Sequence, residues 1–355
     1  MKENLCVESI KAREIINGVG IPTIEVDVVT VGKVVGRASV PSGTSKGKYE
    51  ALELKDGEKR YLGEGVLKAV ENVNTLIAKR IRGMDVTQQK EIDQALINLD
   101  ETPNKSRLGA NAILGVSLAS ARAASIAIGT SLYKYLAMSD SYKMPMPMAT
   151  VIAGGKYAGN KLDFEDYLIF PIIPLTFREA TQAILEVHYI LGKKLKERFG
   201  SVCMVGTGYT PPISNTSECL DLICESCREA GYGNCFALGL DVAANLFYDE
   251  ESQLYDVSGK KLSRQELLKY YEKLIANYPV RLIEDPFSED DFEGFKQITD
   301  ALKIQIVGDD LFASNEKRLK RGFEIGSANT LLLKLNQVGT VTEAFDVGKL
   351  ALLNG

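Results

Sequence analysis

The chain has 355 residues, 45% of them hydrophobic and 25% charged, a composition typical of a globular protein with two domains and a substantial core. The formal net charge of -5 is small for this length, and neither sign forms a long run. Nucleic acid and anionic membrane surfaces are therefore poor candidate partners, and a small-molecule ligand is favoured. No stretch approaches the roughly 18 apolar residues of a membrane span, and residues 1–4 lead into strand-like sequence rather than a signal peptide. We therefore expect a cytoplasmic protein.

The N-terminal part of the chain predicts an α+β domain. Residues 24–28 alternate apolar and acidic side chains, and residues 34–40 follow across a Gly-Lys turn, which is typical of an antiparallel hairpin. From Val66 onward the apolar residues take helical spacing, and Gly83 is placed to end that helix. A second helix, rich in alanine and serine, is expected over residues 111–128.

A domain junction is expected at residues 144–147, where two prolines would interrupt both helices and strand ladders. We therefore assign residues 1–143 to the N-terminal domain and residues 144–355 to a C-terminal domain. Beyond the junction, helical runs alternate with short apolar segments, which predict strands buried on both faces of a parallel sheet, in a barrel or a doubly wound fold. Three Ser or Thr residues have the capping-box spacing to a glutamate: Thr176 with Glu179, Ser263 with Glu266, and Thr340 with Glu343. The short apolar segments are residues 237–240, 280–283, 304–307 and 330–333.

An ionisable residue follows each of these four segments: Asp241, Glu284, Asp309 and Lys334. In a parallel barrel the C-terminal strand ends open on one face, so the four side chains would converge there. Three buried carboxylates repel one another unless a cation compensates their charge, and an all-oxygen set suits Mg²⁺. A lysine beside bound cations has its pKa lowered toward that of a general base. Four unrelated surface charges would be the alternative, but their repeated placement favours a metal site with a lysine base.

Longer motifs around these residues resemble the enolase family. They include Leu-Ile-Glu-Asp-Pro-Phe at residues 282–287, Gly-Asp-Asp-Leu at residues 308–311, and Leu-Leu-Leu-Lys-Leu-Asn-Gln-Val-Gly-Thr at residues 331–340. In the N-terminal domain, residues 40–47 resemble the mobile active-site loop of the family, and residues 108–117 resemble its helical motif. The resemblance covers essentially the whole chain. It implies an α/β fold, an enolase-type (β/α) barrel preceded by an α+β N-terminal domain.

The activity of the family is that of phosphopyruvate hydratase, a magnesium-dependent lyase. It reversibly dehydrates 2-phosphoglycerate to phosphoenolpyruvate in glycolysis and gluconeogenesis. The resemblance implies that Asp241, Glu284 and Asp309 bind Mg²⁺ and that Lys334 removes the proton α to the carboxylate. It also implies that Ser45 contacts the substrate and binds a second Mg²⁺ as the loop closes. The partner expected from it is a small phosphorylated carboxylate.

Several positions depart from the family pattern. Gly208 stands where the family has the glutamate of its Val-Gly-Asp-Glu-Gly-Gly run, the acid that expels hydroxide. Tyr157 replaces a histidine that follows Gly-Gly-Lys, and Glu165 and Asp166 replace the next Gln-Glu pair. We interpret Asp166 as a substitute for the acidic partner at that place, and Glu165 and Tyr157 as substrate-binding candidates. The arginine of the family's Ser-Arg-Gly-Asn-Pro-Thr run is absent from residues 18–23.

The sequence stops at Gly355, where the family continues into a Ser-His-Arg-Ser-Gly-Glu strand and a later lysine. We expect a barrel without its last βα units, whose unpaired edges would favour a homodimer or a partner that completes it. Two alternatives to the hydratase stay open. One is a divergent paralogue with impaired activity or with activity on another carboxylate, and the other is a non-catalytic Mg²⁺-binding or scaffolding subunit.

The six cysteines, in a chain without an export signal, predict reduced thiols rather than disulfides. Cys219, Cys224 and Cys227 have the spacing of an iron-sulfur site, with Cys235 as a candidate fourth ligand. The same three residues fall on one arc of a predicted helix, where cysteine behaves as a small apolar core residue, and this interpretation is favoured. His188, inside another predicted helix, is expected to be structural.

Overall fold

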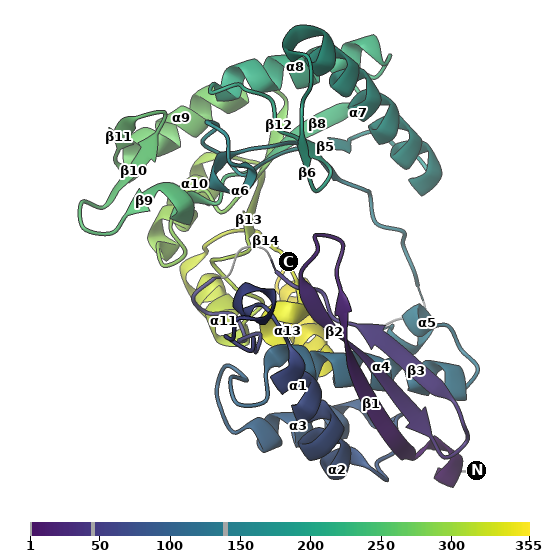
Figure 1. Cartoon of the computed structure of the whole chain (residues 1–355). Helices are drawn as coiled ribbons and strands as arrows, with labels where there is room; N and C mark the ends of the chain where they lie inside the picture. Colours follow the sequence, from purple (N-terminus) through teal and green to yellow (C-terminus); the bar gives the residue numbers. More distant parts are fainter. Residues whose placement is uncertain (1, 44–46, 138–140) are drawn as a thin grey trace. The chain divides into compact units, whose positions relative to one another are not determined.

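The structure is a computed structural model that describes residues 2–43, 47–137 and 141–355. It divides into two compact units, which are described separately below (Figure 1). The first unit comprises residues Met1–Tyr142, Ala313–Leu319 and Leu333–Gly355, and the second comprises Lys143–Phe312 and Lys320–Leu332.

The first unit contains an antiparallel meander of three strands, β1 (Val7–Ile16), β2 (Pro22–Thr30) and β3 (Val35–Ser39). The predicted hairpin is confirmed by the antiparallel pairing of β2 with β3. Alternation along β2 directs Ile24, Val26 and Val28 into the core, where all three are fully buried. Period-two patterning was therefore sufficient to identify both the strand and its buried face.

The predicted helix after Val66 is also confirmed, although it consists of three consecutive segments. These are α1 (Leu67–Asn72), a π-helical turn, η3 (Val73–Ile77), and α2 (Ala78–Ile81). Val66, Val73, Ile77 and Ile81 are fully buried, and Gly83 follows in the left-handed conformation at φ 83°. The other N-terminal elements are η1 (Lys2–Leu5), η2 (Arg60–Gly63), α3 (Gln89–Asp100), α4 (Ala110–Ala127) and α5 (Leu132–Leu136).

Helix α4 is the central helix of the first unit and packs against β2 and β3 (Figure 1). A Cβ atom at Gly36 would lie 2.1 Å from the carbonyl oxygen of Ala119, so only glycine permits this approach of strand and helix. Among the described residues, α4 is the one helix that is long and apolar enough to resemble a membrane span. Because 78% of it is buried inside the protein, its apolar character is explained by its position in the core.

Two helices from the end of the sequence also belong to the first unit, α12 (Leu335–Val338) and α13 (Val341–Leu353). The N–H and hydroxyl groups of Thr342 both donate to the Asp93 carboxylate of α3, at 2.9 and 2.6 Å. The N–H of Val341 donates to the Ser117 hydroxyl of α4 at 3.0 Å. This grouping differs from the sequence-based division at residues 143 and 144, because these bonds attach α13 to helices of the N-terminal part.

The second unit is built on one sheet of eight strands in the order β14-β13-β12-β8-β5-β4-β7-β6. The four predicted strands are confirmed, and they pair in parallel along β8, β12, β13 and β14. Strand β5 pairs antiparallel with both β4 and β8. The sequence analysis did not predict an antiparallel strand in this sheet. The strands are β4 (Ala149–Ala153), β5 (Asp166–Pro171), β6 (Met204–Val205), β7 (Gly208–Tyr209), β8 (Phe236–Asp241), β12 (Val280–Glu284), β13 (Gln305–Gly308) and β14 (Thr330–Leu331).

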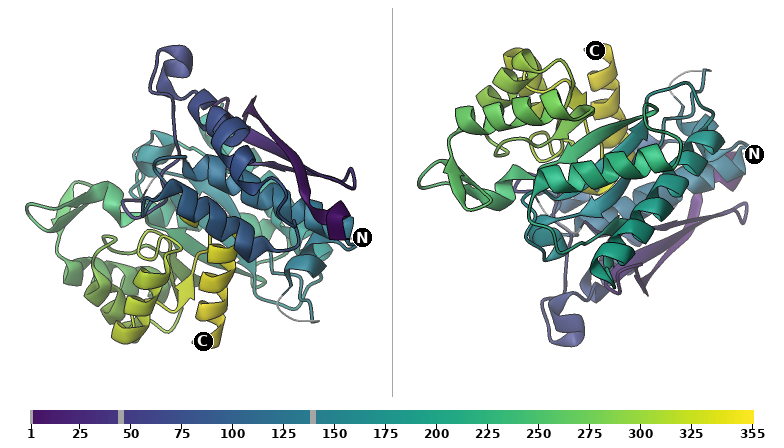
Figure 2. Two further views of the ribbon diagram at one scale, coloured as in Figure 1. Left: turned by 90° about the horizontal axis from the view of Figure 1, so that it is seen from below. Right: turned by 90° about the horizontal axis from the view of Figure 1, so that it is seen from above.

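Amphipathic helices accompany this sheet, and α7 and α8 lie side by side (Figure 2). Two predicted capping boxes are confirmed, with Thr176 and Glu179 at the start of α7 and Ser263 and Glu266 at the start of α9. A small antiparallel sheet, β9 (Tyr248–Asp249), β10 (Leu254–Val257) and β11 (Lys260–Leu262), precedes α9. The remaining elements are α6 (Gly155–Ala158), α7 (Phe177–Phe199), α8 (Thr216–Glu229), η4 (Ala244–Phe247), α9 (Arg264–Asn277), α10 (Phe292–Ala301) and α11 (Glu316–Ile325), the last of which continues from the first unit into the second.

Candidate active site

The carboxylates predicted from the strand ends lie at one edge of the sheet of the second unit. Asp241 is the last residue of β8 and is in parallel register with Glu284, the last residue of β12. Glu284 is in turn opposite Val307 of β13, and Asp309 follows that strand after Gly308. Since neighbouring strands are roughly 4.8 Å apart, the register brings these three residues to adjacent positions. The strand register thus agrees with the expected order of the three residues along this edge, and their roles stay predictions.

Asp166 reaches the same edge from the opposite chain direction. It is the first residue of β5, and the antiparallel register pairs it with Asp241. One carboxylate oxygen, Oδ2, accepts a hydrogen bond from the Thr150 hydroxyl at 2.9 Å. The other oxygen, Oδ1, is buried and has no hydrogen-bond partner in the structure. Burial raises the pKa of the Asp166 carboxyl.

A fifth carboxylate, Asp285, received no role from the sequence. Its side chain accepts hydrogen bonds from the backbone N–H groups of Asp309, Asp310 and Leu311, at 3.2, 2.8 and 3.4 Å. Asp285 is buried and adopts the left-handed conformation at φ 41°, an unfavourable backbone state for a side chain other than glycine. The strain is consistent with a carboxylate that fixes the turn after β13 and thereby orients Asp309.

Glu284, Asp285 and Asp309 each offer an oxygen within 4.8 Å of the others, and all three are buried. Burial raises the pKa of Asp241 well above its ordinary value, and the charges of Glu284 and Asp285 raise it further. Burial likewise raises the pKa of Asp285, and the charges of Asp310, Glu284 and Asp309 raise it further. A bound cation would relieve this repulsion, and buried carboxylate oxygens are the donors that Mg²⁺ prefers. The residues present therefore fit a hard divalent metal.

Lys334 belongs to the first unit, whereas these carboxylates belong to the second. It lies at the start of α12, and its backbone N–H donates to the Ser314 hydroxyl at 2.9 Å. Strand β14 was predicted to extend to residue 333 but ends at Leu331. The N–H of Leu332 still donates to the Gly308 carbonyl at 3.2 Å, so the chain continues beside β13 for one more residue.

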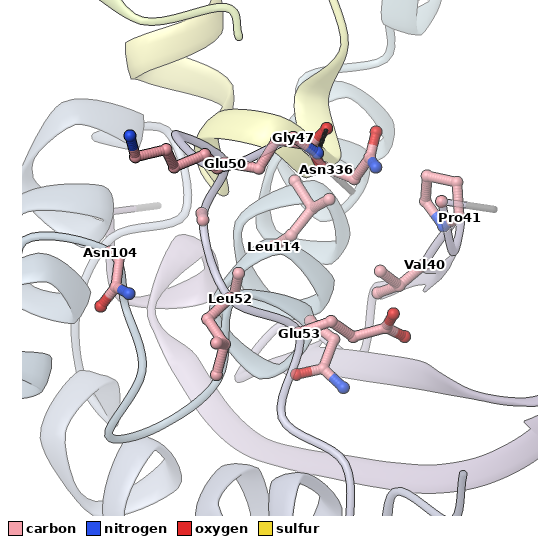
Figure 3. A pocket seen from close by; sticks show the side chains of 14 residues that line it. Val40, Pro41, Gly47, Glu50, Leu52, Glu53, Asn104, Leu114 and Asn336 are labelled. Carbon is pink, nitrogen blue, oxygen red and sulfur yellow. Dashed lines mark hydrogen bonds between the residues drawn. The ribbon is translucent and has the colours of Figure 1, made fainter. Parts of the chain in front are cut away.

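A cavity of about 180 Å³ lies in the first unit beside the segment that resembles the family loop (Figure 3). Val40, Leu52 and Leu114 supply apolar walls, while Glu53 and Asn336 are among its polar residues. Ser45, assigned to substrate and to a second Mg²⁺, lies outside the described residues.

Comparison with known proteins assigns both parts of the chain. Residues 7–136 match the family described as enolase, N-terminal domain, and residues 141–355 match enolase, C-terminal TIM barrel domain. The chain belongs to the enolase family. Enolase from Methanopyrus kandleri is 51% identical over 356 residues, which cover 98% of this chain and 83% of that protein. Enolase from Methanocaldococcus jannaschii is 51% identical over 358 residues, which cover 100% of this chain and 84% of that protein. Enolase from Pyrococcus furiosus is 50% identical over 357 residues, which cover 98% of this chain and 83% of that protein.

The resemblance drawn from the motifs is thus confirmed, as is the fold class of an enolase N-terminal domain with a C-terminal TIM barrel domain. Within the barrel sequence, the antiparallel β5 places Glu165 and Asp166 at the edge that carries the acidic residues. The backbone carbonyl of Glu165 accepts a hydrogen bond from the N–H of Gly154 at 2.7 Å. Tyr157 lies in the short helix α6, which begins directly after that glycine.

Gly208, which the sequence analysis placed opposite the enolase-family glutamate, is packed too tightly to carry a side chain. It lies in β7, which pairs with β4. A Cβ atom added there would lie 2.6 Å from the backbone nitrogen of Ala153 and 2.9 Å from Cγ2 of Thr150. The backbone at this position therefore leaves no room for an acidic side chain.

The three cysteines with iron-sulfur spacing, Cys219, Cys224 and Cys227, all lie on helix α8. Among the residues that the structure describes, the only group of three or more His, Cys, Asp or Glu close enough to share a metal ion is the acidic one above. Cys219 and Cys227 are buried on α8, as the core interpretation predicted, and burial raises the pKa of the Cys227 thiol to about 12. His188 stacks on Tyr209 with ring centroids 4.6 Å apart, which agrees with a structural role.

Proposed function

We propose that this enolase-family chain is a Mg²⁺-dependent lyase that reversibly dehydrates 2-phosphoglycerate to phosphoenolpyruvate in glycolysis and gluconeogenesis. The observation that carries the proposal is the set of buried carboxylates aligned at one sheet edge, in a sequence about half identical to enolases over nearly its whole length. A cluster of buried carboxylates is costly unless it binds a cation, so its presence supports a function that uses one.

We assign Asp241, Glu284 and Asp309 as the ligands of the principal Mg²⁺, with Asp285 holding the turn that carries Asp309. When bound, the metal would supply the positive charge that makes a proton next to a carboxylate acidic enough to remove. Ser45 is proposed as a ligand of a second Mg²⁺ and as a substrate contact, on the resemblance of its motif alone.

Lys334 is the proposed general base. The N–H of Leu332 is bonded to Gly308, directly before Asp309, and Lys334 follows only two residues later. Two residues of extended chain span at most about 7 Å, so covalent connectivity limits how far the Lys334 backbone can lie from that strand end. A lysine beside bound cations would have its pKa lowered toward the range useful for proton abstraction.

The acid that expels hydroxide is proposed to be Asp166, since Gly208 cannot fulfil this role. Burial raises the pKa of Asp166, which favours the protonated form that a general acid needs. Its register with Asp241 supports a position at the metal-bearing edge. Glu165 and Tyr157 are proposed to contact the substrate, because they lie next to Asp166 and in the neighbouring helix α6.

Gly208 also favours a second candidate, a divergent member that removes the α-proton but expels hydroxide slowly or acts on another carboxylate. A non-catalytic Mg²⁺-binding or scaffolding subunit is the candidate from a different class. The three functions separate in one experiment, in which purified protein is incubated with Mg²⁺ and 2-phosphoglycerate in deuterated water. Both α-proton exchange and formation of phosphoenolpyruvate are followed.

Formation of product would support the hydratase, and exchange without product would support the divergent enzyme. The absence of both would contradict the proposal and favour a binding role. Lys334→Ala is expected to abolish exchange while leaving the Mg²⁺ affinity within about twofold, and Lys349→Ala, at an exposed position on α13, is the matched control. Cytoplasmic localisation and association into a homodimer or with another partner stay predictions.

A further inference from the structure

A chain of hydrogen bonds centred on two buried residues connects the proposed base to residues 47–51, at the end of the loop motif, and all of its members belong to the first unit. Ser314 is the first member. Its hydroxyl accepts the backbone N–H of Lys334 at 2.9 Å and donates to Oε1 of Gln337 at 2.7 Å. Ser314 is fully buried, and Gln337 is 2% exposed. Because the hydroxyl has a single proton, donating to Gln337 leaves its lone pairs to accept from Lys334.

Gln337 extends the chain to residues 47–51. Its side-chain Nε2 donates to Oε1 of Glu50 at 3.4 Å, and the same oxygen accepts the backbone N–H of Gly47 at 3.0 Å. The backbone carbonyl of Gln337 accepts the N–H of Ala51 at 2.7 Å. Glu50 and Gly47 line the same cavity as Asn336, the residue before Gln337 (Figure 3). Gln337 is therefore held by both its side chain and its main chain.

The backbone at Ser314 is strained in a way that this arrangement explains. Ala313 and Ser314 are consecutive residues in the left-handed region, at φ 45° and 49°. Each such conformation costs roughly 1 kcal/mol or more outside glycine and persists only where the surroundings enforce it. Here the strained turn places the serine hydroxyl between Lys334 and Gln337.

We propose that Gln337 is a positioning residue for Lys334, acting through Ser314, and that it fixes Gly47 in the same hydrogen-bonded assembly. This inference rests on the proposed function only in treating Lys334 as the general base. The positioning itself concerns backbone amides and can be measured in protein without substrate. The amide orientation is specific, because Oε1 must face a donor and Nε2 must face a carboxylate.

The substitution Gln337→Glu tests this orientation. It replaces the Nε2 donor at the buried position 337 by an oxygen that faces the Glu50 carboxylate, so that two like charges repel each other. Ser314→Ala removes only the bridging hydroxyl and should fold normally, which keeps the test valid if Gln337→Glu is unstable. Glu50→Gln is the matched control, since an amide oxygen can still accept from both Gly47 and Gln337. The double variant Gln337→Glu with Glu50→Gln removes the repulsion and should recover most of the loss.

The first readout is amide hydrogen exchange of the peptides that contain Lys334 and Gly47, with peptides of α4 as an internal reference. Gln337→Glu should accelerate exchange at both sites at least tenfold, and Ser314→Ala should do so at Lys334 alone. Glu50→Gln should stay within about threefold of the wild type. Unchanged protection at Lys334 in both Ser314→Ala and Gln337→Glu would overturn the inference, and equal acceleration throughout α4 would show a purely structural role and overturn it as well.

The second readout is α-proton exchange of 2-phosphoglycerate. Gln337→Glu should lower it roughly 10- to 100-fold while Mg²⁺ affinity changes less than twofold, and the double variant should restore it substantially. Proton exchange in Gln337→Glu equal to that of the wild type would contradict the positioning role. A wild type with no exchange at all would refute the proposed function instead, and in that case the amide exchange still decides whether Gln337 holds Lys334.

Discussion

Gly208→Ala is expected to destabilise the second unit. The backbone conformation of Gly208 would tolerate alanine, but the surrounding atoms leave no space for the added methyl group. The φ angle of Gly208 is outside the left-handed region, so the added methyl group would cause no dihedral strain. The new Cβ would lie 2.6 Å from the nitrogen and 2.8 Å from the Cβ of Ala153, and 2.9 Å from Cγ2 of Thr150. Carbon atoms in contact prefer roughly 3.5 to 4.0 Å, so β7 and β4 would have to separate by most of an ångström.

The magnitude follows from two opposing terms. Overpacking of this kind costs about 1 to 3 kcal/mol, while replacing glycine restricts the unfolded chain and returns about 0.4 to 1 kcal/mol. The expected net loss is about 1 to 2 kcal/mol in the free energy of unfolding, or a decrease of several degrees in Tm. Scanning calorimetry measures it directly. Gly18→Ala is the control, since no atom lies within 4 Å of the added Cβ and the position is exposed.

If Gly208→Ala melted like Gly18→Ala, the packing argument would be refuted. A longer side chain at position 208 would then be compatible with the fold, and the proposal that Asp166 replaces the family glutamate would lose its main structural support. A clear loss of stability would instead show that this backbone has adapted to glycine and that restoring the family glutamate by a single substitution should fail.

Three further outcomes are expected. Mg²⁺ at 100 times its Kd should stabilise the second unit by about 2.7 kcal/mol in calorimetry. Asp241→Asn should remove this effect. The variant should be no less stable than the wild type without Mg²⁺, because it lacks a buried carboxyl group that its acidic neighbours repel. Asp27→Asn should cost about 1.5 to 3 kcal/mol at pH 7, because the carboxylate accepts hydrogen bonds from two arginines. The hydrogen bond from Arg37 lowers the pKa of Asp27 in the folded protein. This stabilisation should therefore be complete above the unfolded pKa of about 3.9 and disappear as the pH falls through the lower folded pKa. Acid denaturation of the wild type and the variant would measure the difference. Iodoacetamide at neutral pH should alkylate exposed Cys203 far faster than buried Cys219 and Cys227, as peptide mass spectrometry would detect, and equal rates in the native protein would contradict the burial of α8.

Much of the site could be predicted from the sequence because its signals are local. A short apolar segment followed by a carboxylate identifies both a buried strand and its functional end, and this reasoning located Asp241, Glu284 and Asp309. Period-two and period-3.6 patterns likewise identified the β2–β3 hairpin and the helices of the N-terminal part. Side-chain spacing along one element is set by backbone geometry alone, so it can be inferred without knowing the neighbours.

Other features were decided by contacts between residues far apart in the sequence. Nothing in the residues of β5 states that it runs against β4 and β8, yet this direction is what places Asp166 opposite Asp241. The role of Asp285 depends on backbone N–H groups 24 to 26 residues later, which become available only when β13 pairs with β12.

The grouping of the last helices with the N-terminal part had the same origin. Asp93 and Ser117 bind the start of α13 across more than 220 residues, and Gln337 reaches Glu50 across 287. The sequence by itself determined the elements, the family and the chemical types of the site. Only the tertiary structure decided which strand directions and which buried hydrogen bonds bring those residues together, because pairing partners and register depend on the whole fold rather than on any one segment.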